Sequence, residues 1–93
     1  MTEASFRDNE AEGRLELHLE TGIVTADYRR RPGELAILYV YAPPHLRGTG
    51  ASDRLMREVA SLARAEGVKI RPLCGYARRW LQAHSAHRDL VTA

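Results

Sequence analysis

The spacing of apolar residues changes abruptly in the middle of the chain. Residues 34–41 are apolar at almost every position, which is typical of a central strand that is covered on both faces. From residue 50 to residue 66, apolar residues recur at intervals of three and four, and Gly67 follows where a helix C-cap belongs. Any fold of this chain must therefore carry a loop rich in proline and glycine from the end of a buried strand to the start of a helix.

Further strands are predicted on both sides of this segment. Residues 14–20 and 23–30 alternate apolar and polar positions, so each strand should have one face against the core. Residues 68–74 resume a strand pattern after the helix, and such a strand–helix–strand unit is expected to be right-handed. A shorter helix is predicted over residues 75–84, and the tail after it has room for one more turn.

These elements predict a layered α/β fold. We expect a mixed, mostly antiparallel sheet of about four strands that includes one parallel pair, with two or three helices. A chain of 93 residues has room for one domain, here residues 1–93. Residues 1–12 are polar and are expected to form a poorly structured or edge segment.

The composition indicates a cytoplasmic protein. No apolar run approaches the roughly 20 residues of a membrane helix, and the chain begins with polar and acidic residues, unlike a secretory signal. Cys74 is the only cysteine, so it has no partner for an internal disulfide and suits a reducing compartment. We therefore expect no membrane partner.

The charge favours an anionic ligand. The net charge is +2 and the sequence pI is about 9.0, because nearly every basic residue is an arginine. Nucleic acid is the less favoured anion. Arginines cluster at residues 29–31 and 78–79, but no exposed aromatic residues are interleaved with them.

The loop at residues 43–52 is the clearest chemical signal. The first amides of a helix lack partners and the helix dipole is positive there, so this position binds an anion such as a pyrophosphate. Gly48 and Gly50 would let the backbone approach the anion closely. The alternative is a loop that only turns the chain before an N-cap at Thr49 or Ser52. The lysine of a nucleotide P-loop and the third glycine of a dinucleotide site are absent.

These residues resemble the acetyl-coenzyme A (acetyl-CoA) signature of the Gcn5-related N-acetyltransferase (GNAT) superfamily, Arg-x-x-Gly-x-Gly/Ala after a strand. Arg47 and Gly50 match this signature, and Ser52 replaces its last small residue. Farther along, the pattern Pro72-x-Cys74-x-Tyr76 resembles the short single-domain branch related to the YjdJ proteins. The resemblance covers residues 13 to 90, although the His-Thr pair of that branch is absent before the loop.

The resemblance implies a minimal GNAT-like fold in which the two parallel strands splay apart. It implies that acetyl-CoA is the cosubstrate, with its pantetheine arm along the central strand and its pyrophosphate in the loop. The residues implied to bind this cofactor are Val40, Tyr41, Ala42, Arg47, Gly48, Thr49, Gly50, Ala51 and Ser52.

Cys74 and Tyr76 are the candidate catalytic residues. Acetyl transfer to an amine needs a polarised thioester carbonyl, a deprotonated amine and a proton for the leaving thiolate. Cys74 is expected near the thioester as an acetyl carrier, as a wall of the acetyl pocket or as a core residue. No histidine or lysine lies next to Cys74 in the sequence to lower the pKa of its thiol and so favour the thiolate. Tyr76 is either the proton donor or a half-buried packing residue.

The histidines indicate no metal site. His45 precedes the loop and is interpreted as a solvated residue, and His18 falls on the polar face of a strand. His84 and His87 fall at a helix end without cysteines at ligand spacing, so we expect no metal.

Three functions are compatible with these patterns. The first is an N-acetyltransferase that uses acetyl-CoA and a primary amine of unknown identity, either a small molecule or a protein. Only Thr21-Gly22 separates the first two predicted strands, where full-length relatives place helices, so the acceptor side should be open. The second is a CoA-binding module with little or no turnover. The third, a nucleic-acid-binding domain, lacks a recognisable recognition motif.

Overall fold

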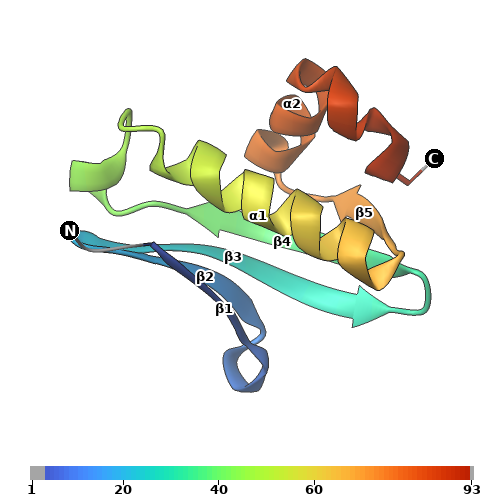
Figure 1. Cartoon of the computed structure of the whole chain (residues 1–93), viewed down its shortest axis with the longest axis horizontal. Helices are drawn as coiled ribbons and strands as arrows, with labels where there is room; N and C mark the ends of the chain where they lie inside the picture. Colours follow the sequence, from blue (N-terminus) through green and yellow to red (C-terminus); the bar gives the residue numbers. More distant parts are fainter. Residues whose placement is uncertain (1–3, 93) are drawn as a thin grey trace.

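A computed structural model describes residues 4–92, which fold into a five-stranded sheet and helices (Figure 1). The strands are β1 (Ser5–Asn9), β2 (Arg14–Leu19), β3 (Gly22–Arg31), β4 (Glu34–Tyr41) and β5 (Lys69–Pro72). The α-helices are α1 (Ala51–Glu66) and α2 (Gly75–Ala83). The 3-10 helices are η1 (Glu10–Glu12), η2 (Pro44–Leu46) and η3 (Ser85–Leu90).

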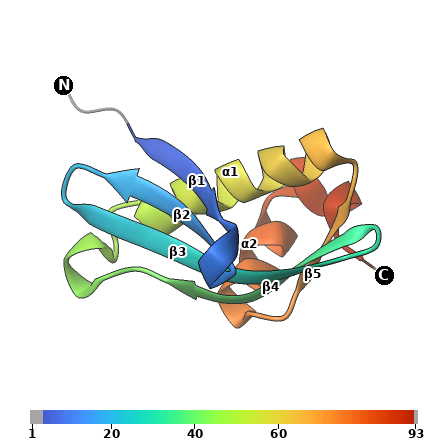
Figure 2. The same cartoon turned by 90° about the horizontal axis from the view of Figure 1, so that it is seen from below.

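The strands are adjacent in chain order, β1-β2-β3-β4-β5, as Figure 2 shows. Every neighbouring pair is antiparallel except β4 and β5, which are parallel and joined through α1. The predicted mixed, mostly antiparallel sheet with one parallel pair is therefore confirmed. The sheet has five strands rather than about four.

The additional strand is β1, at the edge of the sheet. It pairs with β2 along its whole length, from Ser5 opposite His18 to Asn9 opposite Arg14. Phe6 is its only large apolar residue and packs against the core. An edge strand is held mainly by backbone hydrogen bonds to one neighbour, so it needs no run of alternating apolar residues. For this reason the sequence predicts residues 1–12 only as a poorly structured or edge segment; the edge alternative holds for residues 5–9, and residues 1–3 lie outside the described residues.

A β-bulge divides β4 into two halves. Tyr28 on β3 lies opposite Ile37, whereas the preceding residue, Asp27, lies opposite Tyr39. Leu38 is thus an extra residue on β4, and it reverses the alternation of side chains from that point.

The two halves of β4 differ in burial because of this bulge. Leu35, Ala36 and Ile37 are buried, but Tyr39 is 55% exposed and Tyr41 is 40% exposed. The prediction that residues 34–41 are covered on both faces is correct for the first half and wrong for the second. The side chains of the second half of β4 are therefore partly open to solvent.

Helix α1 covers the core face of the sheet. Its apolar stripe is buried against strands β2 to β5, which confirms the helical spacing predicted from the sequence. The fully covered positions of the stripe are Leu55, Met56, Val59, Ala60 and Ala63. Helix α2 and η3 pack beside α1 at the β5 side of the sheet (Figure 1). Within residues 4–92, no helix is long and apolar enough to cross a membrane.

Candidate functional site

A cleft of about 530 Å³ lies between the second half of β4, the following loop and the first turn of α1. Tyr76 from α2 closes one side of it. This volume falls within the range of small-molecule sites. The lining residues are Tyr39, Val40, Tyr41, Ala42, Leu46, Arg47, Gly48, Gly50, Ala51, Ser52, Asp53 and Tyr76.

The cleft exists because β5 leaves the sheet before β4 ends. The parallel register of the two strands stops where Ile37 faces Pro72. The Ile37 carbonyl then accepts two hydrogen bonds, from the amide of Leu73 at 2.9 Å and from the amide of Cys74 at 3.2 Å. The chain turns away there into α2, while β4 continues to Tyr41 with β3 as its only partner. One backbone edge of residues 38–41 therefore faces the cleft without a neighbouring strand.

The first turn of α1 points its amides toward this cleft. Gly50 precedes the helix with φ 87° and no side chain caps the helix start. The Thr49 hydroxyl instead donates to the Leu46 carbonyl, so the alternative of a Thr49 or Ser52 N-cap is wrong. Among the described residues, the amides of residues 51–53 have no hydrogen-bond partner. Such an end attracts an anion.

The two glycines of the loop are required by its backbone conformation. Gly48 has φ 78° and Gly50 has φ 87°, in the left-handed region that other residues occupy at a cost of about 1–2 kcal/mol. A Cβ atom at either position would meet no other atom within 4 Å. The space in front of both residues is open, so a ligand can reach the backbone there.

Arg47 is the only arginine among the residues that line the cleft. Its Nε donates to the Ala42 carbonyl at 2.9 Å, and its guanidinium lies 5.7 Å from the centre of the Tyr41 ring. The side chain therefore crosses from the loop to the end of β4. This charge adds to the attraction that the helix start exerts on an anion.

Tyr76 lies in the cleft, but Cys74 does not line it. Tyr76 is half-buried, and burial together with the nearby negative charge of Asp53 raises the pKa of its phenol. The hydroxyl therefore stays protonated at neutral pH. Cys74 is partly buried against the hydrophobic core at the start of α2. This placement matches the core interpretation of Cys74 among the three considered.

Most residues nominated from the sequence lie together in the cleft. Of that set, only Thr49 and Cys74 do not line it. Tyr39, Leu46 and Asp53 line the cleft but were not nominated. An acidic residue in the first turn of a helix is common, so the sequence carried no signal that singled out Asp53.

The histidines lie outside the cleft and have structural contacts. His45 Nε2 donates to the Thr21 carbonyl at 2.6 Å, which ties η2 to the turn between β2 and β3. His84 stacks on Trp80 with ring centres 4.0 Å apart. Across residues 4–92, no three His, Cys, Asp or Glu side chains are grouped as a metal site would require.

The arrangement of the sheet, the crossover helix and the cleft defines a known class of fold. A GCN5-like protein from Staphylococcus aureus, solved by NMR in solution, superposes with a TM-score of 0.71 and 19% sequence identity. The match covers 100% of this chain and 92% of that protein. At this identity the likeness concerns the fold.

The family comparison is more specific. The family described as GCN5-related N-acetyl-transferase matches residues 14–90, which is most of the chain. The protein therefore belongs to the GCN5-related N-acetyltransferase family. The predicted superfamily is confirmed. The search of curated proteins gives no match.

Proposed function

We propose that this protein binds acetyl-CoA in the cleft beside β4 and transfers the acetyl group to a primary amine. The proposal depends on one observation: two sets of backbone groups without hydrogen-bond partners line the same cleft. One is the uncapped start of α1, and the other is the free edge of residues 38–41. Family membership supports the same activity.

The residues of the cleft fit the two polar parts of the cofactor. The pyrophosphate has the amides of residues 51–53, the open backbone at Gly48 and Gly50, and the positive charge of Arg47. The pantetheine arm contains amides, which can pair with the free edge of β4 as an added strand. Val40, Tyr41 and Ala42 supply that edge.

Tyr76 is the proposed proton donor. When bound, acetyl-CoA supplies the thioester whose carbonyl carbon a deprotonated amine attacks. Tyr76 gives its proton to the sulfur as the C–S bond breaks, and recovers a proton from the attacking nitrogen through solvent. A tyrosine phenol carries its proton at neutral pH even without a shift, and the upward shift of its pKa does not change that state. Cys74 is not required in this route, and direct attack by the amine replaces an acetyl-cysteine intermediate.

The first experiment separates binding from transfer. Calorimetry measures CoA binding to the whole chain, and labelled acetyl-CoA measures transfer to a panel of primary amines, including diamines and lysine peptides. We expect binding together with transfer to at least one amine. Tyr76→Phe should lower the transfer rate by about 100-fold while the dissociation constant of CoA changes little. Absence of CoA binding would contradict the whole proposal.

A second outcome of that experiment defines the alternative function. CoA binding without transfer to any amine would identify a CoA-binding module. The position of Cys74 outside the cleft favours this alternative over a covalent enzyme. Cys74→Ala should leave transfer within about threefold if Tyr76 is the acid, and a stable acetyl-Cys74 in mass spectrometry would restore the covalent route.

A further inference from the structure

Asp53 joins the two helices that border the cleft. It lies in the first turn of α1, beside the loop, and lines the cleft. Its Oδ1 accepts a hydrogen bond of 2.8 Å from the Trp80 indole on α2. Its Oδ2 accepts a hydrogen bond of 2.8 Å from Arg57 Nε one turn farther along α1. Both carboxylate oxygens are therefore occupied, and these two donors hold the pKa of Asp53 below its usual value.

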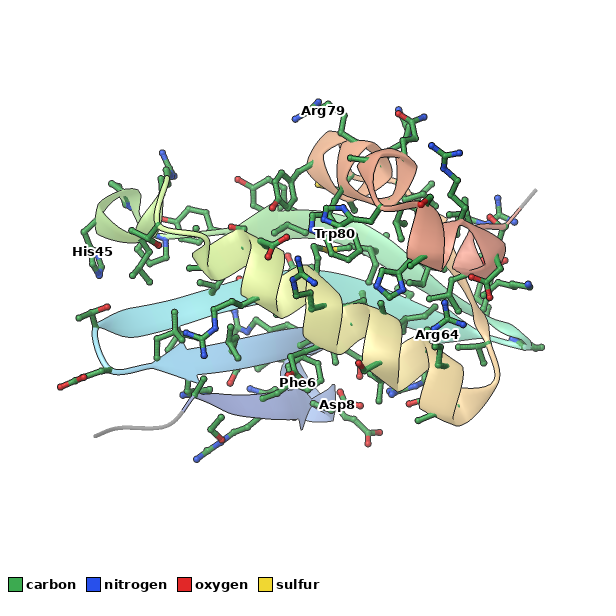
Figure 3. The ribbon with its side chains drawn as sticks, turned by 45° about the horizontal axis from the view of Figure 1, so that its top comes forward. Phe6, Asp8, His45, Arg64, Arg79 and Trp80 are labelled. Atoms are coloured by element: carbon green, nitrogen blue, oxygen red, sulfur yellow. The ribbon has the colours of Figure 1, made fainter. Side chains whose placement is uncertain are left out.

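Trp80 is fixed at the junction of the two helices, where Figure 3 labels it. The residue is 5% exposed. His84 stacks on the ring and its Nδ1 donates to the Trp80 carbonyl at 2.7 Å, while its Nε2 lies 3.6 Å from Asp53 Oδ1. The indole has one N–H donor, and Asp53 accepts it. Loss of this acceptor would leave a covered donor without a partner.

Tyr76 shares a helix face with Trp80. The two residues are four positions apart on α2, so their side chains lie one above the other on the same side of the helix. The hydrogen bond between Asp53 and Trp80 joins this face of α2 to the first turn of α1. Tyr76 and the cofactor-facing start of α1 are therefore linked through one side-chain contact.

We propose that Asp53 and Trp80 are positioning residues that hold the Tyr76 hydroxyl in register with the helix start that binds the cofactor. This inference rests on the proposed function. Asp53 belongs to the same turn as the amides expected to bind pyrophosphate, so one turn of α1 places both the cofactor and the proton donor. The contact is between a side chain and an indole, and it can be removed without altering the backbone of the loop.

The test compares variants that break this contact with variants that keep it. Asp53→Ala and Trp80→Phe remove the hydrogen bond, whereas Asp53→Asn retains an acceptor oxygen for the indole. Arg57→Gln removes the other partner of Asp53 and is the matched control, because Arg57 is exposed and does not line the cleft. Circular dichroism and melting temperatures establish that each variant is folded.

We expect kcat to fall by about 10- to 100-fold in Asp53→Ala and Trp80→Phe, with the dissociation constant of CoA within about threefold of wild type. Asp53→Asn and Arg57→Gln should stay within about threefold in kcat. In a Tyr76→Phe background, Trp80→Phe should have little further effect, because the group that it positions is already absent. A merely structural role would lower kcat equally in both backgrounds.

Two kinetic results would overturn the inference: unchanged kcat in both Asp53→Ala and Trp80→Phe, or a loss that persists undiminished in the Tyr76→Phe background. A readout without turnover separates this failure from failure of the proposed function. The chain has four tyrosines, so ring-labelled tyrosine gives few NMR signals, and Tyr76→Phe assigns one of them. That signal should move in Trp80→Phe, and it should move farther in Asp53→Ala than in Asp53→Asn, because both variants lose the same nearby charge but only Asn keeps the acceptor. Equal movement in the two Asp53 variants would report the lost charge alone and would contradict the inference. If it stays in place in all three variants, Asp53 does not position Tyr76, whether or not acetyl is transferred.

Discussion

The two ends of α1 are built in opposite ways. At its C-terminal end, Gly67 adopts a left-handed conformation, and the amides of Gly67 and Val68 return to the carbonyls of Arg64 and Ala63. These bonds form a Schellman motif. At its N-terminal end, Gly50 is also left-handed, but no side chain satisfies the first amides. Glycine thus closes one end of the helix and leaves the other end open.

Side chains reinforce this difference. Arg30 on β3 donates to Glu66 at the C-terminal end with a shortest distance of 2.7 Å, and also to Asp8 on β1 at 2.7 Å. Tyr28 donates to the same Asp8. The N-terminal end instead borders the cleft. Both ends have side-chain contacts, since Asp53 joins the N-terminal end to α2, but only the N-terminal end has backbone amides that no partner satisfies. Substitutions at the two ends should therefore affect different measurements.

The largest expected difference is between two single variants that replace a left-handed glycine of α1 by valine, one at each end of the helix. Gly50→Val should weaken CoA binding by more than about 100-fold, because valine strains the left-handed turn and fills the space in front of the amides. Gly67→Val is the matched control, since Gly67 also has a positive φ and open space around it. Both variants should lose about 1–2 kcal/mol of stability. Equal CoA affinity in the two variants, measured by calorimetry, would contradict the comparison.

Alkaline pH should lower the free energy of unfolding through Tyr28, which belongs to the contacts near the C-terminal end of α1. Burial and Asp8 raise the pKa of Tyr28 to about 12 in the folded protein, against about 10 for a free tyrosine. Above pH 10 the unfolded chain loses this proton first, so stability present below pH 10 is lost as pH rises toward 12. The loss attributable to Tyr28 is about 2–3 kcal/mol. Urea unfolding at pH 9 and pH 11.5 measures it.

Tyr28→Phe provides the control for that titration. The variant should be less stable than wild type at pH 9 but should lose less stability between the two pH values, because it has no phenol to ionise there. An identical loss in both proteins would assign the alkaline effect to other groups.

The next effect is that of Arg30→Gln. This change removes the ion pairs with Asp8 and Glu66, which are partly exposed, and should lower the free energy of unfolding by about 1 kcal/mol. CoA affinity should be unchanged because Arg30 is remote from the cleft lining. A melting curve and a CoA titration of the same sample test both statements, and a weakened CoA affinity would show that the two ends of α1 are coupled.

The smallest effect is expected at Ser52. Its hydroxyl replaces the small residue of the acetyl-CoA signature and does not cap the helix. Ser52→Ala should change the dissociation constant of CoA by less than about threefold, since the contact proposed for this residue is made by its backbone amide. A larger loss would show that the hydroxyl itself binds phosphate.

The features that the sequence predicts are those with local causes. Helix α1 follows from its apolar spacing and Gly67, and the loop follows from its prolines and glycines. These signals lie within a few residues of the features that they specify, so they need no knowledge of distant contacts. The same reason explains why most of the candidate site residues line one cleft, since most of them belong to this loop and its two flanking elements.

The features that the sequence does not predict depend on distant partners. The bulge at Leu38 arises from the pairing of β4 with β3, and no local signal marks it. Asp53 and Trp80 are 27 positions apart and meet only through the packing of α2 on α1. The sequence leaves three interpretations of Cys74 open, and the turn of the chain at Leu73, which places Cys74 against the core, depends on the Ile37 carbonyl of a distant strand. Each of these outcomes is decided by tertiary structure.

The early end of β5 also has a consequence for exchange with solvent. Residues 34–37 have a paired strand on both sides, so their amides can exchange only when the sheet opens. Residues 38–41 have β3 on one side only, and the amides that face the other way are protected by no strand. A single strand thus contains a slowly exchanging half and a half in which the amides that face away from β3 exchange rapidly. A ligand that pairs with the second half would make the whole strand exchange slowly, so deuterium uptake in these few residues would report directly whether the cleft is filled.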